Sequence, residues 1–376
     1  MRELSIYLHI PFCVRKCLYC DFLSFPVGAG ADDKRIESYV NLLKEEIIKE
    51  APKYRAHQVI SVFWGGGTPS LVAAKAVSEI METLRRYYRL AADAEITIEV
   101  NPGTVTADKL QAYITAGMNR LSIGLQSADG KELEGLGRIH TYADFLDTYH
   151  MAREEGFSNI NVDLISAIPF QTLQSWERTL RRVAELGTEH ISAYSLIIEE
   201  GTPFYERYRQ HPDAAGRCLA ELPDEEEERR MYYETETILE EYGYRRYEIS
   251  NYAREGFQCR HNLGYWERAE YLGIGVGAAS LMGNMRWIEG EAPEALSEKD
   301  CMEEYMFLGL RKMAGVSKNA FAEMSGQSME DVYGAVIEDM KEKGLLLEEG
   351  DSIRLTKRGI DVSSYVMCRF LLDEEE

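Results

Sequence analysis

Short apolar segments alternate with amphipathic segments through the first two hundred residues of the chain. Six apolar segments have the length of buried strands and lie at 5–10, 59–64, 95–100, 120–125, 159–165 and 190–196. Segments with helical periodicity lie between them, at 36–48, 73–88, 107–116, 142–155 and 175–186. Repeated strand–helix alternation favours a parallel sheet covered by helices. Six such units suit an α/β fold, a partial, open (β/α)6 barrel, which we assign to residues 1–205.

The pattern changes after about residue 203. The stretch 207–223 contains short polar runs and two prolines, which is typical of a loop. Residues 224–242 have the pattern of a strongly charged helix, which we expect to face solvent. Residues 244–251 predict an additional strand at the open edge of the barrel. We therefore assign residues 206–297 to an extension of the barrel.

The last segment, residues 298–376, combines helical patterns with a hairpin. Helices are predicted at 302–313, 321–324 and 329–343, and short strands at 345–347 and 353–355 flank a turn. Helices followed by a hairpin describe a winged-helix-like α+β domain. Residues 300–376 contain 17 Asp and Glu against 9 Lys and Arg, so a protein-contact or lid role is favoured over nucleic-acid binding.

Length and composition predict an intracellular protein of more than one domain. The chain has 376 residues, 45% of them apolar, and chains beyond about 250–300 residues tend to divide. No run of 18 apolar residues predicts a membrane helix, and the first apolar stretch is too short for a signal peptide. The net charge of −22 argues against nonspecific nucleic-acid binding.

Three cysteines, Cys13, Cys17 and Cys20, follow the first predicted strand at C-x3-C-x2-C spacing. Zinc fits poorly, because structural zinc sites use four protein ligands and only His9 stands nearby as a fourth. A disulfide framework is disfavoured, because seven cysteines are few for this length and their number is odd. Three thiolates can instead hold three irons of a [4Fe–4S] cluster and leave the fourth iron open. Such an oxygen-sensitive cluster favours a reducing compartment, the cytoplasm.

A run of three glycines, Gly65, Gly66 and Gly67, ends the second predicted strand and precedes Thr68. Glycines there let backbone amides and carbonyls approach a ligand without side-chain interference. The run lacks the spacing of a dinucleotide fingerprint and the Lys-Ser/Thr pair of a phosphate loop. The later glycines of residues 273–277 lack an acidic partner, and we interpret them as close packing or a pocket edge.

Polar residues end or interrupt three of the apolar strands, at Glu99, Gln126 and Asp163. In barrels of this kind the active site forms at the C-terminal ends of the strands, so these side chains can converge on a ligand. A buried polar group without a partner costs about 1–3 kcal/mol. Ordinary internal hydrogen bonds would also satisfy these groups, and the sequence leaves both interpretations open.

The segment from Tyr7 to Cys13, the cysteine spacing and the GGGTP run resemble radical S-adenosylmethionine (SAM) proteins related to oxygen-independent coproporphyrinogen III dehydrogenase, over essentially the whole chain. The resemblance implies that the amino and carboxylate groups of SAM chelate the open iron. It also implies that SAM is contacted by Tyr7, Gly66, Gly67, Thr68, Glu99, Gln126, Arg138 and Asp163. Tyr19 and Ile197 are weaker matches, and the sequence alone makes Arg138 an ordinary exposed arginine.

Two features separate the branches of this group. The dehydrogenase branch typically carries C-x3-C-x2-C-x-C after a long extension, whereas Phe22 stands at the fourth position here and the extension is missing. Residues 259–266, CRHNLGYW, are similar to the H-N-x-x-Y-W heme-binding segment of HemW-type heme chaperones. The chain is identified as a member of the heme-chaperone branch.

The resemblance makes His261 the candidate axial ligand of heme iron, with Tyr265 and Trp266 as flat apolar surface. A lone histidine is more often an ordinary hydrogen-bonding residue, and Cys259 is a competing thiolate ligand. We expect this segment to lie near the mouth of the cluster site. The flanking arginines either meet heme propionates or are simply solvated: Arg245, Arg246, Arg254 and Arg260. The remaining cysteines are isolated and expected to be inert: Cys218, Cys301 and Cys368.

Two functions therefore remain. The first is a heme chaperone that hands heme to an acceptor hemoprotein, such as a membrane-associated respiratory enzyme, and that can form a homodimer. The second is a radical enzyme that oxidatively decarboxylates coproporphyrinogen III. Phe22 and the missing extension favour the first, and the retained SAM positions keep the second open.

Overall fold

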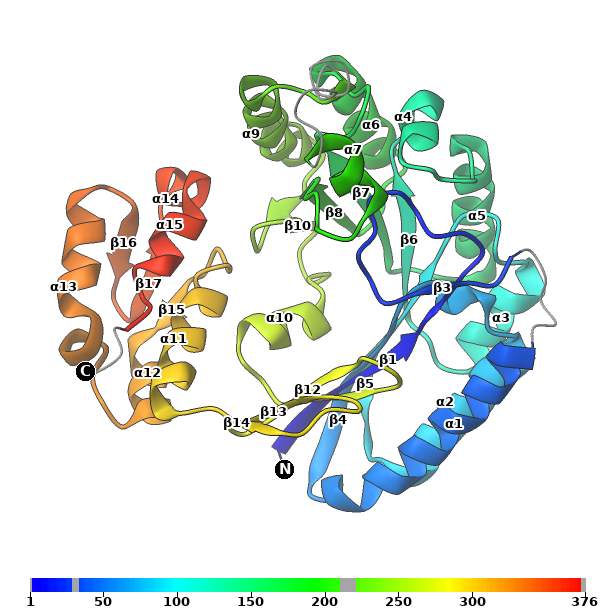
Figure 1. The fold of residues 1–376 in the computed structure, drawn as a ribbon, viewed down its shortest axis with the longest axis horizontal. Helices are drawn as coiled ribbons and strands as arrows, with labels where there is room; N and C mark the ends of the chain where they lie inside the picture. Colours follow the sequence, from blue (N-terminus) through cyan, green and yellow to red (C-terminus); the bar gives the residue numbers. More distant parts are fainter. Residues whose placement is uncertain (1, 29–33, 210–220, 373–376) are drawn as a thin grey trace.

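A computed structural model describes residues 2–28, 34–209 and 221–372. The fold is organised by one large sheet whose six central strands are parallel. In spatial order these strands are β1 (Arg2–Ile10), β4 (His57–Gly66), β5 (Leu90–Val100), β6 (Arg120–Gln126), β7 (Ile160–Ser166) and β8 (His190–Ser195). Spatial order follows chain order, as expected for repeated strand–helix units. The predicted partial barrel is confirmed (Figure 1).

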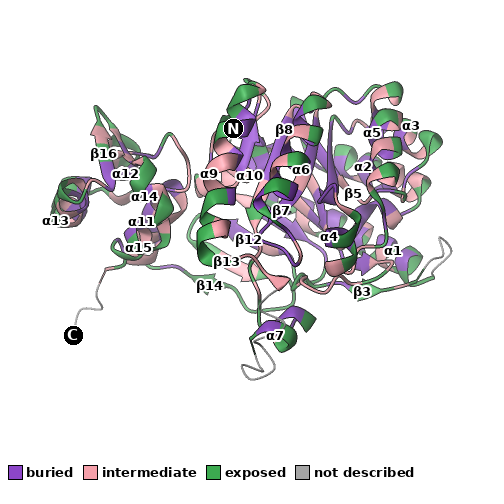
Figure 2. Cartoon of the chain, turned by 90° about the horizontal axis from the view of Figure 1, so that it is seen from above, coloured by how far each residue is buried: buried purple, intermediate pink, exposed green. Residues whose placement is uncertain are grey.

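The helices that connect these strands cover the outer face of the sheet (Figure 1). They are α1 (Lys34–Glu50), α2 (Ala74–Tyr87), α3 (Ala107–Thr115), α4 (Gly130–Gly135), α5 (Tyr142–Glu155) and α6 (Leu173–Glu185), with 3-10 turns at η1 (Ala51–Tyr54) and η2 (Pro69–Leu71). Capping boxes begin α5 at Thr141 and α6 at Thr172. Apolar faces of the helices and strands share one core, and Figure 2 shows the strands buried beneath helices whose outer faces are exposed.

Shorter strands extend both edges of the parallel sheet. β10 (Asn251–Ala253) pairs antiparallel with β8, and β9 (Arg245–Arg246) pairs with β10. At the other edge β11 (Tyr271–Ile274) runs parallel to β1, followed by β12 (Ala279–Met282), β13 (Met285–Ile288) and β14 (Glu294–Ala295).

The single strand predicted at 244–251 is therefore two shorter strands. Glu248 turns the chain between them, because its carboxylate accepts hydrogen bonds from the amide of Ser250 at 2.9 Å and the side chain of Asn251 at 2.6 Å. In the later glycine run, a Cβ at Gly273 would lie 2.2 Å from the carbonyl oxygen of Ala279. Close packing thus accounts for that glycine.

Two expectations for the region after β8 need correction. α7 (Pro203–Tyr208) occupies the start of the predicted loop, and residues 210–220, with Cys218, lie outside the described residues. α9 (Glu225–Glu241) does not simply face solvent, because Met231 and Ile238 on one side are buried in the core. The many charged residues of this segment masked its apolar side in the sequence pattern. That side packs against α6.

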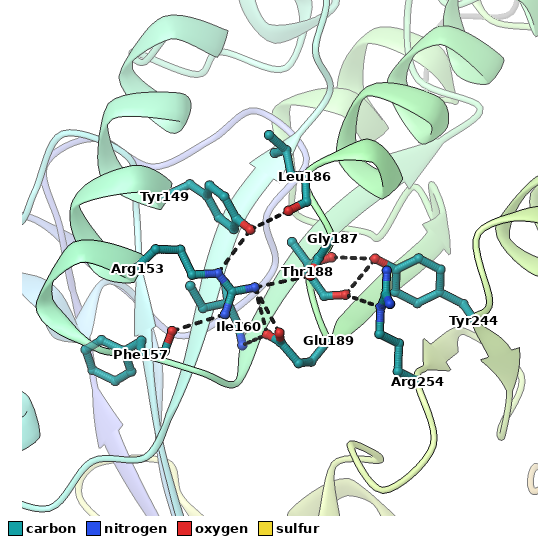
Figure 3. A network of polar contacts seen from close by, with 10 residues as sticks. All are labelled: Tyr149, Arg153, Phe157, Ile160, Leu186, Gly187, Thr188, Glu189, Tyr244 and Arg254. Carbon is teal, nitrogen blue, oxygen red and sulfur yellow. Dashed lines mark hydrogen bonds and ion pairs between the residues drawn. The ribbon is translucent and has the colours of Figure 1, made fainter.

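A polar network ties α5 to the beginning of β8 (Figure 3). Arg153 donates to the carboxylate of Glu189 at 3.0 Å and to the carbonyl of Phe157 at 3.1 Å. Glu189 also accepts from the backbone amide of Ile160 at 2.9 Å. Because these groups are largely buried, their hydrogen bonds fix the N-terminal ends of β7 and β8 more firmly than surface pairs would.

The C-terminal residues form a second unit with its own core. Helices α11 (Glu298–Gly309), α12 (Lys318–Ser325), α13 (Met329–Glu342), α14 (Lys357–Asp361) and α15 (Ser363–Cys368) pack around a small sheet in the order β15 (Val316–Ser317), β17 (Ser352–Leu355), β16 (Leu346–Glu349). Figure 1 shows this unit beside the barrel. Helices followed by a hairpin agree with the winged-helix-like prediction. Within the described residues no helix is both long and apolar enough to cross a bilayer.

Phe321 of α12 is fully buried in the second core. Phe321→Ala removes the ring and leaves a cavity, so we expect a loss of about 3–5 kcal/mol in the stability of this unit. Met324→Ala, on the exposed side of the same helix, should change stability by less than about 0.5 kcal/mol. Denaturant unfolding of the full chain measures both variants, and equal losses would contradict the described core.

Candidate cofactor site

A cavity of about 490 Å³ opens at the C-terminal ends of the parallel strands. The loop after β1 and the ends of β4 to β8 form its walls. Most residues predicted from the sequence line it: Cys13, Cys17, Cys20, Gly66, Gly67, Thr68, Glu99, Gln126, Arg138 and Asp163, together with Tyr19 and Ile197. Tyr7 and His261 are not among the described residues that line this cavity.

Backbone hydrogen bonds hold the cysteine loop in place. β2 (Phe12–Cys13) pairs in parallel with β3 (Phe25–Pro26), and the amide of Val27 donates to the carbonyl of Cys13 at 2.9 Å. The amide of Leu18 donates to the carbonyl of Leu136 at 3.1 Å, which attaches the loop to the end of α4. The loop is therefore closed on itself and fixed to the barrel.

The three thiols are grouped around the cavity. In the described part of the chain, no three His, Cys, Asp or Glu side chains surround a single metal-ion position. Burial raises the pKa of Cys20 to about 11, so its thiolate needs a compensating positive charge. Iron supplies such a charge, because metal binding deprotonates thiol ligands. The chemistry of these residues fits an iron–sulfur cluster.

A chain of hydrogen bonds connects two of the thiols. Thr68 Oγ1 donates to Cys13 Sγ at 3.5 Å and accepts from Asn101 Nδ2 at 2.8 Å. Arg138 donates to Asn101 Oδ1 at 2.7 Å and to Cys17 Sγ at 3.4 Å. The buried Nε of Arg138 has no hydrogen-bond partner among the described residues. The network thus retains a donor and a positive charge beside the thiols, which suits an anionic group.

Tertiary packing accounts for the position of Arg138. It also gives a structural role to Asn101, which the sequence did not single out. Arg138 donates to the carbonyl of Gly124 at 2.7 Å. A Cβ at Gly124 would lie 3.0 Å from Asn101 Oδ1, so the glycine makes room for the pair. The one sequence signal for Asn101 is its place between a strand end and Pro102, a dipeptide that restricts the backbone.

Gly66 and Gly67 are required by contacts with the protein itself. Gly66 has φ +109°, and a Cβ there would lie 2.5 Å from the ring of His9. A Cβ at Gly67 would lie 2.6 Å from the carbonyl oxygen of Phe12, and the amide of Gly67 donates to Ile10 at 2.8 Å. The glycines therefore let the end of β4 lie directly against the cysteine loop.

Gln126 has a backbone conformation that is unusual for its residue type. Its φ of +73° lies in the left-handed region, which costs a non-glycine residue about 1–3 kcal/mol. The pairing of β6 with β7 shifts register between Gly124 and Gln126. Such strain is concentrated at functional sites, and here it accompanies the turn of the chain at the cavity wall.

Two carboxyl groups, Glu99 and Asp163, also line the cavity. Burial, and next the nearby Asp163, raises the pKa of Glu99 to about 8, while the amide of Gly66 opposes the rise. Burial also raises the pKa of Asp163, although Ser122 and Asn161 donate to it at 3.0 and 2.8 Å. A cationic group of a ligand would favour the ionised forms of both carboxyl groups.

Tyr7 lies behind the glycine run. Its hydroxyl and His9 Nδ1 are hydrogen bonded at 3.1 Å, and its ring stacks on Phe63 with centroids 6.3 Å apart. A Cβ at Gly65 would lie 3.0 Å from the ring. In this structure Tyr7 supports the wall of the cavity, and its direct contact with SAM stays a prediction.

The segment that carries His261 does not lie at the mouth of the cavity, so that expectation is wrong. His261 belongs to α10 (Arg260–Trp266) inside the barrel, where its Nδ1 lies 2.9 Å from Ser61 Oγ of β4. Ser61 pairs with Ser5, five residues before the end of β1, which corresponds to about 15 Å of strand. The reason is Glu95 in the middle of β5, whose carboxylate accepts hydrogen bonds from the first amides of α10.

The environment of His261 favours the neutral ring. Burial lowers its pKa to about 3. Neutral imidazole is the form that binds metals. Its Nε2 is hydrogen bonded to the hydroxyl of Tyr265 at 3.0 Å, and Nδ1 to Ser61. Both nitrogens are therefore occupied, and a role as heme ligand requires a change in the position of α10.

The four flanking arginines do not converge on His261. Arg246, Arg254 and Arg260 each donate to a backbone carbonyl, at 3.1, 3.1 and 2.8 Å, and Arg245 is exposed. Figure 3 shows Arg254 directed to Thr188, which precedes β8, and to the ring of Tyr244. Three of these arginines thus have structural partners, and the group forms no basic cluster for heme propionates.

The parallel open barrel, the cysteine loop and the glycine-rich strand end define a radical SAM protein. The family model of the Radical SAM superfamily matches residues 7–183. Membership of this class implies a [4Fe–4S] cluster and SAM as cofactors. A second family model, the HemN C-terminal domain, matches residues 296–362.

Known proteins narrow the class further. Heme chaperone HemW of Bacillus subtilis is 36% identical over 385 residues, which cover 98% of this chain and 99% of that protein. HemW of Lactococcus lactis is 33% identical, with 98% of each chain covered. The structure of coproporphyrinogen III oxidase (HemN) from Escherichia coli matches with a TM-score of 0.82 and 25% identity, over 98% of this chain and 90% of that one. The chain belongs to the HemW family of heme chaperones, as the sequence predicted.

Arg138→Leu removes the guanidinium between Cys17 and Asn101. Loss of a residue that supports metal ligands typically weakens metal binding about 10- to 100-fold. We expect a decrease of this size in cluster retention, measured as iron and sulfide remaining after anaerobic reconstitution and a chelator challenge. Arg55→Leu, at an exposed arginine, is the control. Wild-type retention in Arg138→Leu would show that the network does not support the cluster.

Glu99→Gln tests the raised carboxyl pKa. In the folded protein Glu99 holds its proton up to a pKa of about 8, against 4.5 ordinarily, so folding takes up a proton between these values. Wild-type stability should therefore fall as pH rises through this window. Glutamine does not titrate, so we expect the variant to gain about 1–4 kcal/mol relative to wild type between pH 5 and 8. Denaturation of cluster-free protein measures the difference, which would stay constant if Glu99 titrated normally.

Proposed function

We propose that this protein is a heme chaperone that binds heme and transfers it to an acceptor hemoprotein. The observation that carries the proposal is similarity along almost the whole chain to the heme chaperone HemW of Bacillus subtilis, at 36% identity. Phe22 supports it, because this side chain stands where the dehydrogenase branch has its fourth cysteine. Phe22 is 63% exposed at the cavity, so the residue serves no obvious packing role.

In this proposal Cys13, Cys17 and Cys20 hold a [4Fe–4S] cluster by three of its irons. When bound, such a cluster would supply one-electron chemistry. Thr68 and Arg138 support the ligation, because each donates a hydrogen bond to a cysteine sulfur. The proposed SAM contacts are Tyr7, Gly66, Gly67, Thr68, Glu99, Gln126, Arg138 and Asp163. Of these, the carboxyl groups of Glu99 and Asp163 suit the ammonium group of SAM.

His261 is the proposed heme ligand, with Tyr265 and Trp266 as apolar surface. Cys259 is the competing candidate. Burial raises the pKa of Cys259 to about 12, and its thiol donates to Glu95 at 3.5 Å. A thiol that keeps its proton is a poor ligand, whereas the ring of His261 is already neutral. These properties favour His261.

The proposal also includes the heme acceptor, the oligomeric state, the compartment and the roles of three segments of the chain. We propose a membrane-associated respiratory enzyme as the acceptor and a homodimer as the donor. A reducing compartment, the cytoplasm, suits the three thiols and the cluster. We propose residues 1–205 for cofactor binding, 206–297 for heme binding and 298–376 for contact with other proteins.

Oxidative decarboxylation of coproporphyrinogen III is the second candidate function. The TM-score of 0.82 with HemN and the cofactor cavity favour it. Identity to HemN is 25%, against 36% to HemW of Bacillus subtilis, so we rank it second.

Heme titration of the reconstituted protein tests the proposal. We expect a heme absorption band in the wild type and binding weakened about tenfold or more in His261→Ala, because the axial bond is lost. His150→Ala, at an exposed histidine, should bind as wild type does. In a parallel assay coproporphyrinogen III should stay unconverted. Protoporphyrinogen in that assay, without heme binding, would establish the second candidate instead.

A further inference from the structure

The beginning of α10 is held by one carboxylate of the barrel. Glu95 of β5 accepts hydrogen bonds from the backbone amides of Arg260 at 3.1 Å and His261 at 3.0 Å. The thiol of Cys259 donates to the same carboxylate at 3.5 Å. Glu95 therefore acts as an N-terminal cap that comes from another element, which satisfies amides that α10 leaves free.

The end of α10 is held by the C-terminal domain instead. The guanidinium of Arg311 lies 4.3 Å from the centre of the Trp266 ring, a cation–π contact. Directly beside it, Glu267 pairs with Lys312 at 3.0 Å. Both cations belong to the turn that follows α11, so two adjacent residues of α10 and its cap contact one turn of the other domain.

A third residue, Arg268, adds a buried ion pair to this contact. Arg268 and Glu304 of α11 lie 2.8 Å apart, with side chains only 8% and 11% exposed. Glu304 also pairs with Arg286 at 2.7 Å. Arg268 further donates to Cys301, which is buried, in keeping with the expected inert thiol. Three successive residues at the C-terminal end of α10 are thus joined to α11 or to the turn that follows it.

The contact is incomplete in two respects. The indole nitrogen of Trp266 and the Nε of Arg311 are buried without a hydrogen-bond partner among the described residues. Arg268 has φ +54°, in the left-handed region. Unsatisfied buried polar groups and backbone strain both destabilise this contact. Backbone strain is also concentrated in regions that switch between positions.

His261 stands between these two attachments and is closed off by them. Its side chain is 2% exposed, its ring stacks on Phe63 at 5.1 Å, and Ser61 and Tyr265 occupy its two nitrogens. While α10 keeps this position, hydrogen bonds occupy both nitrogens that could bind a heme iron.

We infer that this is a closed position of α10, and that the C-terminal domain controls the access of heme to His261 by holding Trp266, Glu267 and Arg268. The inference rests on the proposed heme chaperone function. When the contact with α11 opens, the end of α10 is released while Glu95 still holds its beginning. The apparent affinity for heme is then the intrinsic affinity multiplied by the open fraction, so weakening the contact strengthens binding.

A charge reversal and its restoration test this inference. Glu267→Lys places two lysines together and should raise the rate of heme association about three- to tenfold. The double variant Glu267→Lys/Lys312→Glu restores an ion pair and should return the rate to within about twofold of wild type. Arg311→Leu removes the cation–π contact and should act in the same direction as Glu267→Lys. Lys341→Ala, which removes an ion pair with Glu348 far from α10, is the matched control.

Hydrogen exchange of the α10 amides supplies a readout without heme. Exchange should be faster in Glu267→Lys and Arg311→Leu, and as in wild type in the double variant and in Lys341→Ala. Unchanged exchange together with unchanged heme association would overturn the inference while leaving the heme chaperone proposal intact. Faster exchange with slower or weaker heme binding would also overturn it, since the closed helix would then be the binding form. If no variant bound heme, the proposed function and the control of heme access would both fail.

Discussion

The buried guanidinium of Arg138 is the interaction on which the cofactor site depends. It joins Cys17 to Asn101, and Asn101 continues through Thr68 to Cys13. A loop with three thiols has little reason of its own to lie against strand ends, because thiols make weak hydrogen bonds. A cation that follows α4 and two neutral donors that follow β4 and β5 give the loop one position. The same positive charge compensates the thiolates that an iron–sulfur cluster requires.

The two ends of the barrel carry different chemistry as a result. At the C-terminal ends of the strands, glycines and a strained Gln126 surround a cavity. Burial raises the pKa of the Glu99 carboxyl group there. Near the other end polar side chains fill the interior, and several of them are hydrogen bonded to one another. His190 is hydrogen bonded to Asn161 at 2.6 Å and to Tyr247 at 2.8 Å, and Tyr247 accepts from the amide of Cys259. One end is open for a ligand and the other is closed by α10.

This division explains how one fold suits both heme chaperones and porphyrinogen oxidation. The cavity and its cysteine loop belong to the radical SAM class as a whole. The segment 245–268 instead links the barrel to the C-terminal domain, through pairs such as Arg268–Glu304. Besides Phe22 at the cavity, the proposed heme function depends on this segment, which lies between the two cores.

Sequence alone determined the strand–helix alternation, the thiol spacing, the glycine run and the family, because these are local patterns whose periodicity and spacing need no knowledge of distant contacts. It also placed Glu99, Gln126 and Asp163 at one edge, since parallel strands end together. Tertiary structure alone decided the contacts of Arg138, the role of Asn101, the buried side of α9 and the position of His261 outside the cavity lining. Each depends on a partner distant in the chain, such as Glu95 for α10. Hydrogen bonds and burial between remote residues leave no periodic signal in a single sequence, so only the folded chain reveals them.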